Sequence, residues 1–409
     1  MSDKVRDHYA CYPYPARDPE AEKERLIVGS PSHLLEIDHY LFGGRRNFAA
    51  PFRALVAGGG TGDATVMLAQ QLADAGPGGR VTYLDLSPAA MEIAKARAAA
   101  RGLANIDFVE GSLLDFPAGV KGPFDYIDCC GVLHHLEDPL AGLQALKAVL
   151  AEDGGMGLMV YGALGRRGVY EAQSLLRRLS AGKDLPAQVR IARRLLGSLP
   201  ASNWLRRNPY LGDHRRGDAE LADLLLHPCD RAYRVEAFAE LIAAAGLCLV
   251  SFIEPARYEP ATYIKDPALL SELAALAPLQ RAAAAEELAG NIKTHVCYVS
   301  ARDSDTTAGA WRRDSVPCLR SFAGPDLAKA CARNLSLKVE FDGLPLTFSL
   351  PRLAPLILAR MDNETSVGRI FEALQSLDSQ LDWETFSAQF QRLFEVLNGL
   401  NHLLLKQSA

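Results

Sequence analysis

The sequence predicts an α/β fold, a doubly wound parallel sheet with helices on its faces, and two observations lead to it. Apolar segments of strand length alternate with segments of helical periodicity over residues 51–163 and again over 230–302, which is the pattern of successive strand–helix–strand units. The first of these strands ends in a run of glycines that opens a helix. In a parallel sheet such a turn lies at the edge where ligands bind.

The glycine turn has the spacing G-x-G-x-G, at Gly58, Gly60 and Gly62. Glycines let the backbone pass close to a ligand because no Cβ is in the way, and the helix behind them points unpaired N–H groups at that ligand. A dinucleotide-binding turn, G-x-G-x-x-G, would need a glycine where the chain has Asp63. The acid disfavours a pyrophosphate and suits a ligand with a cationic end.

The second strand, 81–85, ends in Asp85, 23 residues after Gly62. A carboxylate at the end of the second strand of a doubly wound sheet can accept hydrogen bonds from both ribose hydroxyls. A glycine run alone is often only a turn. The turn and Asp85 together predict a site for a nucleoside with a positively charged tail.

The later core elements follow from caps, periodicity and turn residues. Ser87 suits a helix N-cap, Pro88 the first helical position and Gly102 the stop, so we expect a helix over 88–101. Beyond it we expect, in order, a strand at 124–130, a helix at 138–151, a strand from Gly154-Gly155 to near Tyr161, a helical insertion at 164–229, a helix at 235–245, a strand, a helix at 267–289 and a last strand.

From about Arg53 to Ala163 the chain resembles the class I S-adenosylmethionine-dependent methyltransferases. Their first motif is similar to LVAGGGTGDAT, their ribose strand and following helix to VTYLDLSPAAMEIAKARAAARGL, and their adenine loop to VEGSLLDFP; their fourth strand, fourth helix and fifth strand are similar to the segment from FDYIDCC to VYGA. The resemblance implies a seven-stranded, mostly parallel sheet with an antiparallel last strand, S-adenosylmethionine as the cofactor, and methyltransferase activity. The cofactor-binding residues that it implies are Gly58, Gly60, Gly62, Asp63, Asp85, Leu86, Ser112, Leu113, Asp115 and Gly131.

Two positions depart from the family pattern. The family usually carries an acid two residues before the first motif glycine, where it helps to hold the methionine ammonium; this chain has Val56, so Asp63 and backbone carbonyls would have to do more. The adenine loop usually begins Gly-Asp, and here the second residue is Ser112, whose hydroxyl can accept a hydrogen bond while the Leu113 N–H donates one. Asp115, the nearest carboxylate, either binds the cofactor or caps the local turn.

Three side chains at the ends of the fourth and fifth strands are candidates for catalysis: His134, His135 and Tyr161. Methyl transfer is a direct displacement that mainly requires alignment in a dry pocket, so a base is needed only where the acceptor arrives protonated. Either histidine could be that base, or its ring could cap the strand end and line the cofactor. Tyr161 either orients the acceptor or forms the wall, and Tyr12 and Tyr14 could surround an amine.

The insertion is strongly basic. Residues 166–216 contain twelve Lys or Arg and three Asp or Glu, a net charge of +9, whereas the whole chain has −5. Such a segment suits an acidic protein, a nucleic acid or an anionic small molecule, or it is a solvated helical face. Enzymes that methylate exocyclic or amide nitrogens often end the fourth strand in Asn/Asp-Pro-Pro-Tyr/Phe, and Asp128-Cys129-Cys130-Gly131 stands there. This disfavours base methylation and leaves nucleic acid open as a partner.

Composition narrows the class of protein further. No segment approaches 18 consecutive apolar residues, and Met1-Ser2-Asp3-Lys4 lacks the apolar core of a signal peptide. The eight cysteines form no C-x-x-C pair, so neither a disulfide framework nor a metal site is expected. We therefore expect a cytoplasmic protein with reduced thiols, no membrane span and no metal.

Two further parts flank the core. Residues 1–50 form an N-terminal arm with alternating Tyr and Pro, which either closes over the site as a lid or docks onto the sheet. A linker at 302–315 leads to a C-terminal domain, 316–409, in which two alternating segments meet at Asp342-Gly343 as a hairpin and helical patterns follow at 351–361, 366–377 and 384–399. This small α+β domain resembles a winged-helix or PqqD-like module, a type used for peptide or protein docking.

Three functions remain open from the sequence. An insertion, an arm and a docking module suit methylation of a large partner, a lysine or arginine side chain of a protein. Alternatively, the acceptor is a small molecule, the insertion is its lid and the C-terminal module sets oligomerisation, such as a homodimer. The third alternative is a protein that binds S-adenosylmethionine without turnover.

Overall fold

The computed structural model describes residues 8–9, 11–116, 120–302 and 310–407. Met1–Lys4, residue 10 of the Tyr- and Pro-rich segment and residues 303–309 of the expected linker at 302–315 lie outside these residues. The chain forms two compact units. The first comprises Met1–Leu34, Phe48–Leu249 and Gly290–Asp303, and the second Leu35–Asn47, Val250–Ala289 and Ser304–Ala409. The domain boundaries expected from the sequence stay a prediction.

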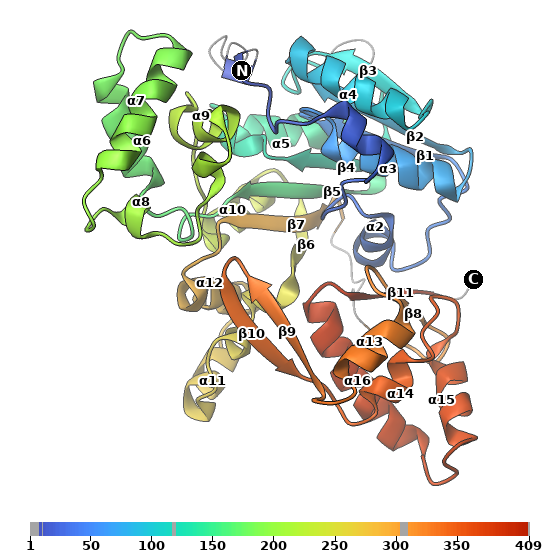
Figure 1. Cartoon of the computed structure of the whole chain (residues 1–409). Helices are drawn as coiled ribbons and strands as arrows, with labels where there is room; N and C mark the ends of the chain where they lie inside the picture. The colour runs from blue at the N-terminus through green and yellow to red at the C-terminus, as the bar shows by residue number, and fades with distance from the viewer. Residues whose placement is uncertain (1–7, 10, 117–119, 303–309, 408–409) are drawn as a thin grey trace. The chain divides into compact units, whose positions relative to one another are not determined.

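A seven-stranded sheet has the strand order β3-β2-β1-β4-β5-β7-β6 (Figure 1). Six of its strands belong to the first unit, and β6 runs across the boundary between Leu249 and Val250. Strands β3, β2, β1, β4 and β5 pair in parallel, and β7 pairs with β5 antiparallel. The predicted α/β fold with an antiparallel strand inserted near one edge is confirmed. The strands are β1 Phe52–Ala57, β2 Gly79–Asp85, β3 Ile106–Glu110, β4 Phe124–Cys130, β5 Leu150–Tyr161, β6 Cys248–Ile253 and β7 Thr294–Ser300.

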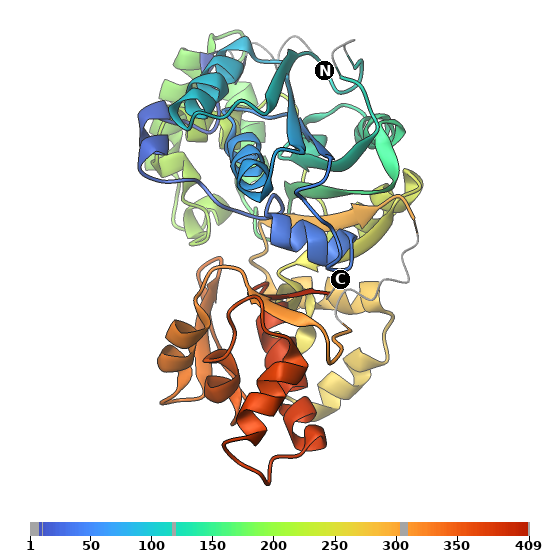
Figure 2. The same ribbon diagram turned by 90° about the vertical axis from the view of Figure 1, so that its right-hand side faces the viewer.

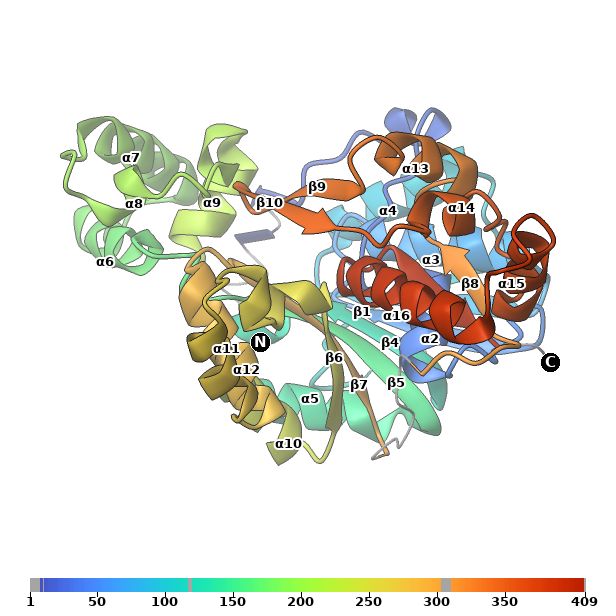
Figure 3. The same ribbon diagram turned by 90° about the horizontal axis from the view of Figure 1, so that it is seen from below.

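The core helices begin at capping residues that the sequence shows. The Ser87 hydroxyl accepts from the Ala90 N–H at the start of α4, and Asp138 does the same for Ala141 at the start of α5. Helix α3 packs on α4 and helix α5 on α10 (Figure 3). The helices are α3 Asp63–Ala75, α4 Pro88–Ala100, α5 Pro139–Ala148 and α10 Val235–Ala244.

Three predicted boundaries need correction. Helix α5 ends at Ala148, and β5 begins at Leu150, before the Gly154-Gly155 pair. The single helix expected over 267–289 is two helices, α11 Pro267–Ala274 and α12 Pro278–Ala289. Proline has no N–H for the helix interior and suits the first turn, so Pro278 ends the pattern and starts a new helix.

The basic insertion is helical, as predicted. Its apolar residues, among them Val169, Leu176, Val189 and Leu221, form a small core of their own. The arginines lie mainly on the outer faces of these helices, which explains the alternation of Leu pairs with Arg pairs. The elements are α6 Val169–Leu179, α7 Leu185–Ser198, α8 Trp204–Arg207, the 3-10 turn η3 Asp213–Arg215 and α9 Asp218–Leu226.

The second unit contains the predicted hairpin. Strand β9 pairs antiparallel with β10, with Phe341 opposite Leu344, and Asp342 and Gly343 take positive φ angles of 48° and 86°, as a two-residue hairpin turn requires. The helices of this unit, drawn in orange and red in Figure 2, contribute most of the residues of an apolar core. Strands β8 and β11 and helix α13 were not predicted, and the winged-helix resemblance stays a prediction. The elements are β8 Val316–Leu319, α13 Gly324–Cys331, β9 Ser336–Phe341, β10 Leu344–Ser349, α14 Ala354–Leu358, α15 Val367–Gln375, α16 Trp383–Gly399 and β11 Leu403–Lys406.

Short elements precede the core: the 3-10 turn η1 Pro19–Lys23 and helix α2 Leu34–Leu41. Among the described residues, no helix is both long and apolar enough to cross a membrane. Within the same part of the chain, no group of three or more His, Cys, Asp or Glu side chains is placed to hold a metal ion.

Candidate functional site

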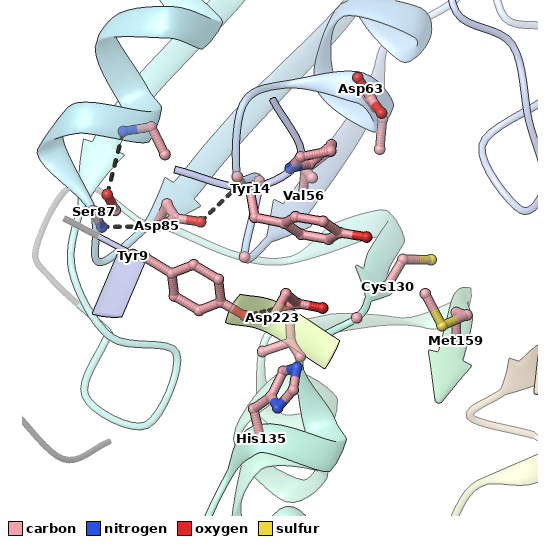
Figure 4. A pocket seen from close by; sticks show the side chains of 18 of the residues that line it. Tyr9, Tyr14, Val56, Asp63, Asp85, Ser87, Cys130, His135, Met159 and Asp223 are labelled. Atoms are coloured by element: carbon pink, nitrogen blue, oxygen red, sulfur yellow. Dashed lines mark hydrogen bonds between the residues drawn. The ribbon is translucent and has the colours of Figure 1, made fainter. Parts of the chain in front are cut away.

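A cavity of about 450 Å³ lies in the first unit, at the carboxyl ends of β1, β2 and β4. This is where the chain order of the strands reverses, with β2 on one side of β1 and β4 on the other, and open α/β sheets bind ligands at such a point. Figure 4 shows Asp85 at one end of the cavity and Cys130 and Met159 at the other, with the Tyr14 ring between them. The cofactor-binding residues predicted from the sequence that line it are Gly58, Gly60, Asp63, Asp85, Leu86, Leu113 and Gly131.

Close packing and positive φ angles explain why glycines occupy the three positions of the turn. Gly58, Gly60 and Gly62 have φ angles of 79°, 50° and 101°, which residues with a Cβ rarely adopt. A Cβ on Gly58 would lie 2.2 Å from the Val132 Cγ2 atom, and one on Gly62 would lie 2.9 Å from the Ala94 Cβ atom. Gly62 does not line the cavity; it is the N-cap of α3. The glycines therefore let the turn between β1 and α3 pack closely against Val132, which follows β4, and against α4 beside the cavity.

Asp85 is held at the cavity by backbone donors. Its Oδ2 atom accepts from the Gly60 N–H at 2.8 Å and its Oδ1 atom from the Ser87 N–H at 2.8 Å, as drawn in Figure 4. Burial raises the pKa of Asp85, although these backbone hydrogen bonds oppose the rise. A carboxylate has about four lone-pair sites, so two further hydroxyl donors can bind to it.

Asp63 is already paired within the protein. Arg17 donates to both of its oxygens, at 2.8 and 2.6 Å, and the Arg97 Nη1 atom donates to Oδ1 at 2.7 Å. Burial alone would raise the pKa of Asp63, but the hydrogen bonds and charges of Arg17 and Arg97 outweigh it and the pKa is lowered. Two guanidinium groups thus offset its charge, and Asp63 lends little negative potential to the cavity.

The loop after β3 contributes mainly through Leu113. Ser112 and Asp115 do not line the cavity: the Ser112 hydroxyl accepts from the Leu114 N–H at 3.1 Å, and the Asp115 N–H donates to the Ser112 carbonyl at 3.2 Å. Their polar groups serve a local turn. Leu113 is 5% exposed and gives the cavity an apolar wall.

His134 and His135, which follow β4, lie in different surroundings. His134 is fully buried, and its ring lies 3.9 Å from the Tyr161 ring, centroid to centroid. Neither ring nitrogen has a hydrogen-bond partner among the described residues, and burial lowers the pKa of His134 well below its usual range. It is a neutral ring in the core and does not reach the cavity.

His135 does line the cavity. Its Nδ1 atom lies 2.8 Å from the Cys229 carbonyl oxygen, which can only accept, so Nδ1 carries the proton in the neutral ring and Nε2 has the lone pair. The ring stacks on His227 with centroids 3.7 Å apart. Burial lowers the pKa of His227 far below its usual value, and nearby His135 lowers it further.

The sequence did not point to Asp223, an acid on α9 that is 3% exposed and lines the cavity. The Tyr161 hydroxyl donates to Oδ2 at 2.9 Å and the Tyr9 hydroxyl to Oδ1 at 3.2 Å. Burial raises the pKa of Asp223, against the opposing effects of His135 and Tyr161. An acid within the apolar run of α9, Leu221 to Leu226, is the signal that could have revealed it.

Arg166 covers the other side of Tyr161. Its guanidinium carbon lies 3.6 Å from the centroid of the Tyr161 ring, and its Nη2 atom pairs with Asp230 at 3.1 Å. The Arg166 side chain is 4% exposed and also lines the cavity. This contact fixes the tyrosine ring and leaves its hydroxyl toward Asp223.

The N-terminal arm is docked onto the glycine turn. The Thr61 hydroxyl donates to the Pro15 carbonyl at 2.8 Å, and Glu22 pairs with Arg97 and with Arg101. Arg97 joins this arm to the turn, because it also donates to the Thr61 carbonyl at 2.8 Å and to Asp63. Tyr9 and Tyr14 of the arm line the cavity, so the arm forms part of its wall.

Comparisons with known proteins agree with this architecture. The family model of a methyltransferase domain matches residues 55–156. An uncharacterized protein from Synechococcus is 35% identical over 267 residues, which are 64% of this chain and 62% of that protein. The ubiquinone biosynthesis O-methyltransferase of Actinobacillus pleuropneumoniae is 35% identical over 81 residues, 19% of this chain and 34% of that protein. The chain thus spans about three fifths of the first relative's length and about a third of the second's.

Solved structures resemble both units. Two structures of PKMT2 from Rickettsia typhi, one of them in complex with AdoHcy, have TM-scores of 0.62 and 0.61 with this chain at 16% identity. They cover 92% and 91% of this chain and 76% and 75% of theirs. At this identity the likeness concerns the fold alone, and its extent includes most of the second unit.

Proposed function

We propose that this chain, a class I methyltransferase by its fold and by the domain at residues 55–156, transfers a methyl group from S-adenosylmethionine to a lysine or arginine side chain of a protein. The cavity supports the cofactor assignment. Asp85 is a half-buried carboxylate that faces the cavity, and the hydrogen bonds it accepts come from backbone N–H groups. The turn from Gly58 to Gly60 forms the adjoining wall. When bound, the cofactor supplies an electrophilic methyl group on a sulfonium.

Each wall of the cavity has a role in this proposal. Asp85 would accept from the ribose hydroxyls, and the Leu113 side chain would cover one face of the adenine. The arm, pinned through Arg97, would exclude water above the glycine turn. Exclusion of water strengthens the electrostatic interactions between the protein and a charged ligand.

The proposed acceptor, a lysine or arginine side chain, is inferred mainly from Asp223. Its carboxylate lies in the same cavity between two tyrosine hydroxyls, and the apolar surroundings raise its pKa. An amine arrives as a cation, which a buried carboxylate attracts. With a raised pKa, the Asp223 carboxylate can also take the proton that the nitrogen must lose before it attacks the methyl group. Aromatic rings beside the acid, Tyr9 and Tyr161, suit a cationic or methylated amine.

One observation favours a second candidate, methylation of a small-molecule amine. The Tyr9–Asp223 hydrogen bond joins the N-terminal arm to α9 of the insertion across the acceptor side of the cavity. A small acceptor would fit behind this contact, whereas a protein side chain requires it to open. The basic insertion and the second unit favour the protein acceptor, because both add surface that a small substrate does not need.

We also propose a cellular location and partners to test. The eight cysteines are all free, which suits the reducing cytoplasm. The positive charge of the insertion keeps nucleic acid and acidic proteins among the partners to test, and homodimer formation stays a prediction.

A labelling experiment tests the proposal. The purified chain is incubated with methyl-tritiated S-adenosylmethionine and either the protein fraction, the RNA fraction or the small-molecule filtrate of a cell lysate. We expect label in the protein fraction, recovered as methylated lysine or arginine after acid hydrolysis, and a rate of labelling roughly 100-fold lower with the Asp223→Asn variant. Label in the filtrate alone would support the small-molecule candidate, and no label in any fraction would support a binding protein without turnover.

A further inference from the structure

The cavity contains a second buried carboxylate that neither the sequence motifs nor the proposed acceptor site uses. Asp128, on β4, is 1% exposed and lines the cavity. Within the described residues, no Lys, Arg or His side chain forms an ion pair with it; the Ser32 hydroxyl donates to its Oδ2 atom at 2.5 Å, and the Cys130 thiol lies 3.7 Å from the same atom. A buried carboxylate without a cationic partner is costly, so its presence calls for a ligand or another explanation.

The pairing of β1 with β4 shows which part of the cavity Asp128 faces. Strands β1 and β4 pair in parallel with Val56 directly opposite Asp128, and both side chains line the cavity. Paired residues on neighbouring strands lie about 4.8 Å apart and project to the same face of the sheet. Asp128 therefore presents a carboxylate one strand away from the apolar Val56 and at the same depth in the cavity.

The other acids of the wall are assigned differently. Asp63 is neutralised by Arg17 and Arg97, and Asp85 lies at the opposite end of the cavity from Cys130 (Figure 4). Glu220 and Asp223 both lie on α9 of the insertion, and Asp223 is bound by two tyrosine hydroxyls. Of these carboxylates, Asp128 is the one at the β1–β4 end of the cavity.

We infer that Asp128 binds the cationic ammonium at the amino-acid end of the cofactor, a function that an acid on β1 at position 56 would otherwise perform. The inference rests on the proposed function, because it assumes that a ligand of this class occupies the cavity. Ser32 orients the carboxylate through its hydroxyl, and the ammonium supplies the cation that the protein itself lacks there. Burial raises the pKa of Asp128 to about 6, which is consistent with a carboxylate that still awaits its cationic partner.

The test compares two ligands that differ at the amino-acid end. S-adenosylhomocysteine carries the ammonium, and 5′-methylthioadenosine has the same nucleoside without it. Calorimetry on the full chain should show that Asp128→Asn weakens S-adenosylhomocysteine binding roughly 10- to 100-fold, the range of a hydrogen bond to a charged group. Binding of 5′-methylthioadenosine should change less than about twofold, since no contact with the nucleoside is lost.

A swap variant tests whether a carboxylate on β1 can replace the carboxylate of Asp128 on β4. Val56→Asp combined with Asp128→Asn returns a carboxylate to the same depth on β1, and we expect it to regain most of the preference for S-adenosylhomocysteine. An Asp128→Asn variant that binds both ligands as the native chain does would overturn the inference. So would a swap variant that folds but has no preference between the ligands, and this second result decides the matter if Asp128→Asn does not fold.

Asp85→Ala separates this inference from the function on which it rests. It should weaken both ligands, because both carry the ribose. If Asp85→Ala weakens both while Asp128→Asn spares S-adenosylhomocysteine, the inference about Asp128 fails and the proposed function stands. If neither ligand binds to the native chain, or Asp85→Ala alters neither affinity, the proposed function fails as well.

Discussion

The Arg97 network offers a prediction that needs no knowledge of the acceptor. Arg97 is 1% exposed and pairs with Glu22, which is 3% exposed, and with Asp63. It also donates to the Thr61 carbonyl. Arg97→Met keeps the length and apolar stem of the side chain but removes the guanidinium. The change should therefore destabilise the first unit and release the N-terminal arm from the glycine turn.

The magnitude follows from burial. Removal of one partner of a buried ion pair costs about 3–5 kcal/mol. Two partners remain to limit the loss, because Arg101 still pairs with Glu22 and Arg17 with Asp63, so we expect the lower end, about 3 kcal/mol of unfolding free energy. For a unit of this size each kcal/mol lowers Tm by about 2–4 °C, which gives a loss of roughly 6–12 °C.

Urea denaturation and thermal unfolding measure the effect. The matched control is Lys95→Met on the same helix, which breaks an exposed pair with Glu92 and should cost about 0.5 kcal/mol or less. Removal of both charges, in Glu22→Met with Arg97→Met, should recover part of the stability, because only the more exposed Arg101 then loses its partner. Equal stability of Arg97→Met and the Lys95→Met control would show that the buried Arg97 pairs do not stabilise the first unit.

Three further predictions concern the site. Asp85→Ala should weaken S-adenosylhomocysteine roughly 100-fold or more, through two hydrogen bonds to a charged group; an unchanged calorimetric affinity would move the site elsewhere. Asp223→Asn should lower kcat/KM for methyl transfer roughly 100-fold, with S-adenosylhomocysteine affinity preserved, and a variant of full activity would remove Asp223 from the acceptor site. The ratio of S-adenosylhomocysteine to 5′-methylthioadenosine affinity should be constant above pH 7 and fall below about pH 6, where Asp128 gains a proton; a ratio that rises on acidification would contradict the sign.

The sequence predicted those parts of the fold and site that depend on local chemistry. Glycines with positive φ, a proline after a capping serine at Ser87, and a two-residue Asp342-Gly343 turn leave a signal in adjacent residues. Asp85 could be placed because it ends the second strand, and in a doubly wound sheet that strand end lies beside the glycine turn that follows the first strand. The strand order followed from the resemblance, not from periodicity.

The features that the sequence did not predict depend on residues distant along the chain. Asp63 looked available for a cation, but Arg17 and Arg97, 46 and 34 residues away, hold it. The placement of Asp128 beside Val56 depends on pairing between strands 72 residues apart. Asp223 reaches the cavity only because the insertion folds back over the end of the sheet. Single-sequence patterns give no distance between such residues.

A crystal structure of the chain grown with S-adenosylhomocysteine would show where the cofactor binds. We expect the ligand in the cavity at the ends of β1, β2 and β4, with its ribose hydroxyls on Asp85 and its ammonium within hydrogen-bond distance of Asp128. The sulfur should face the side of the cavity formed by Asp223 and Tyr161. A ligand bound at another place, or one turned so that its ribose lies away from Asp85, would contradict the account.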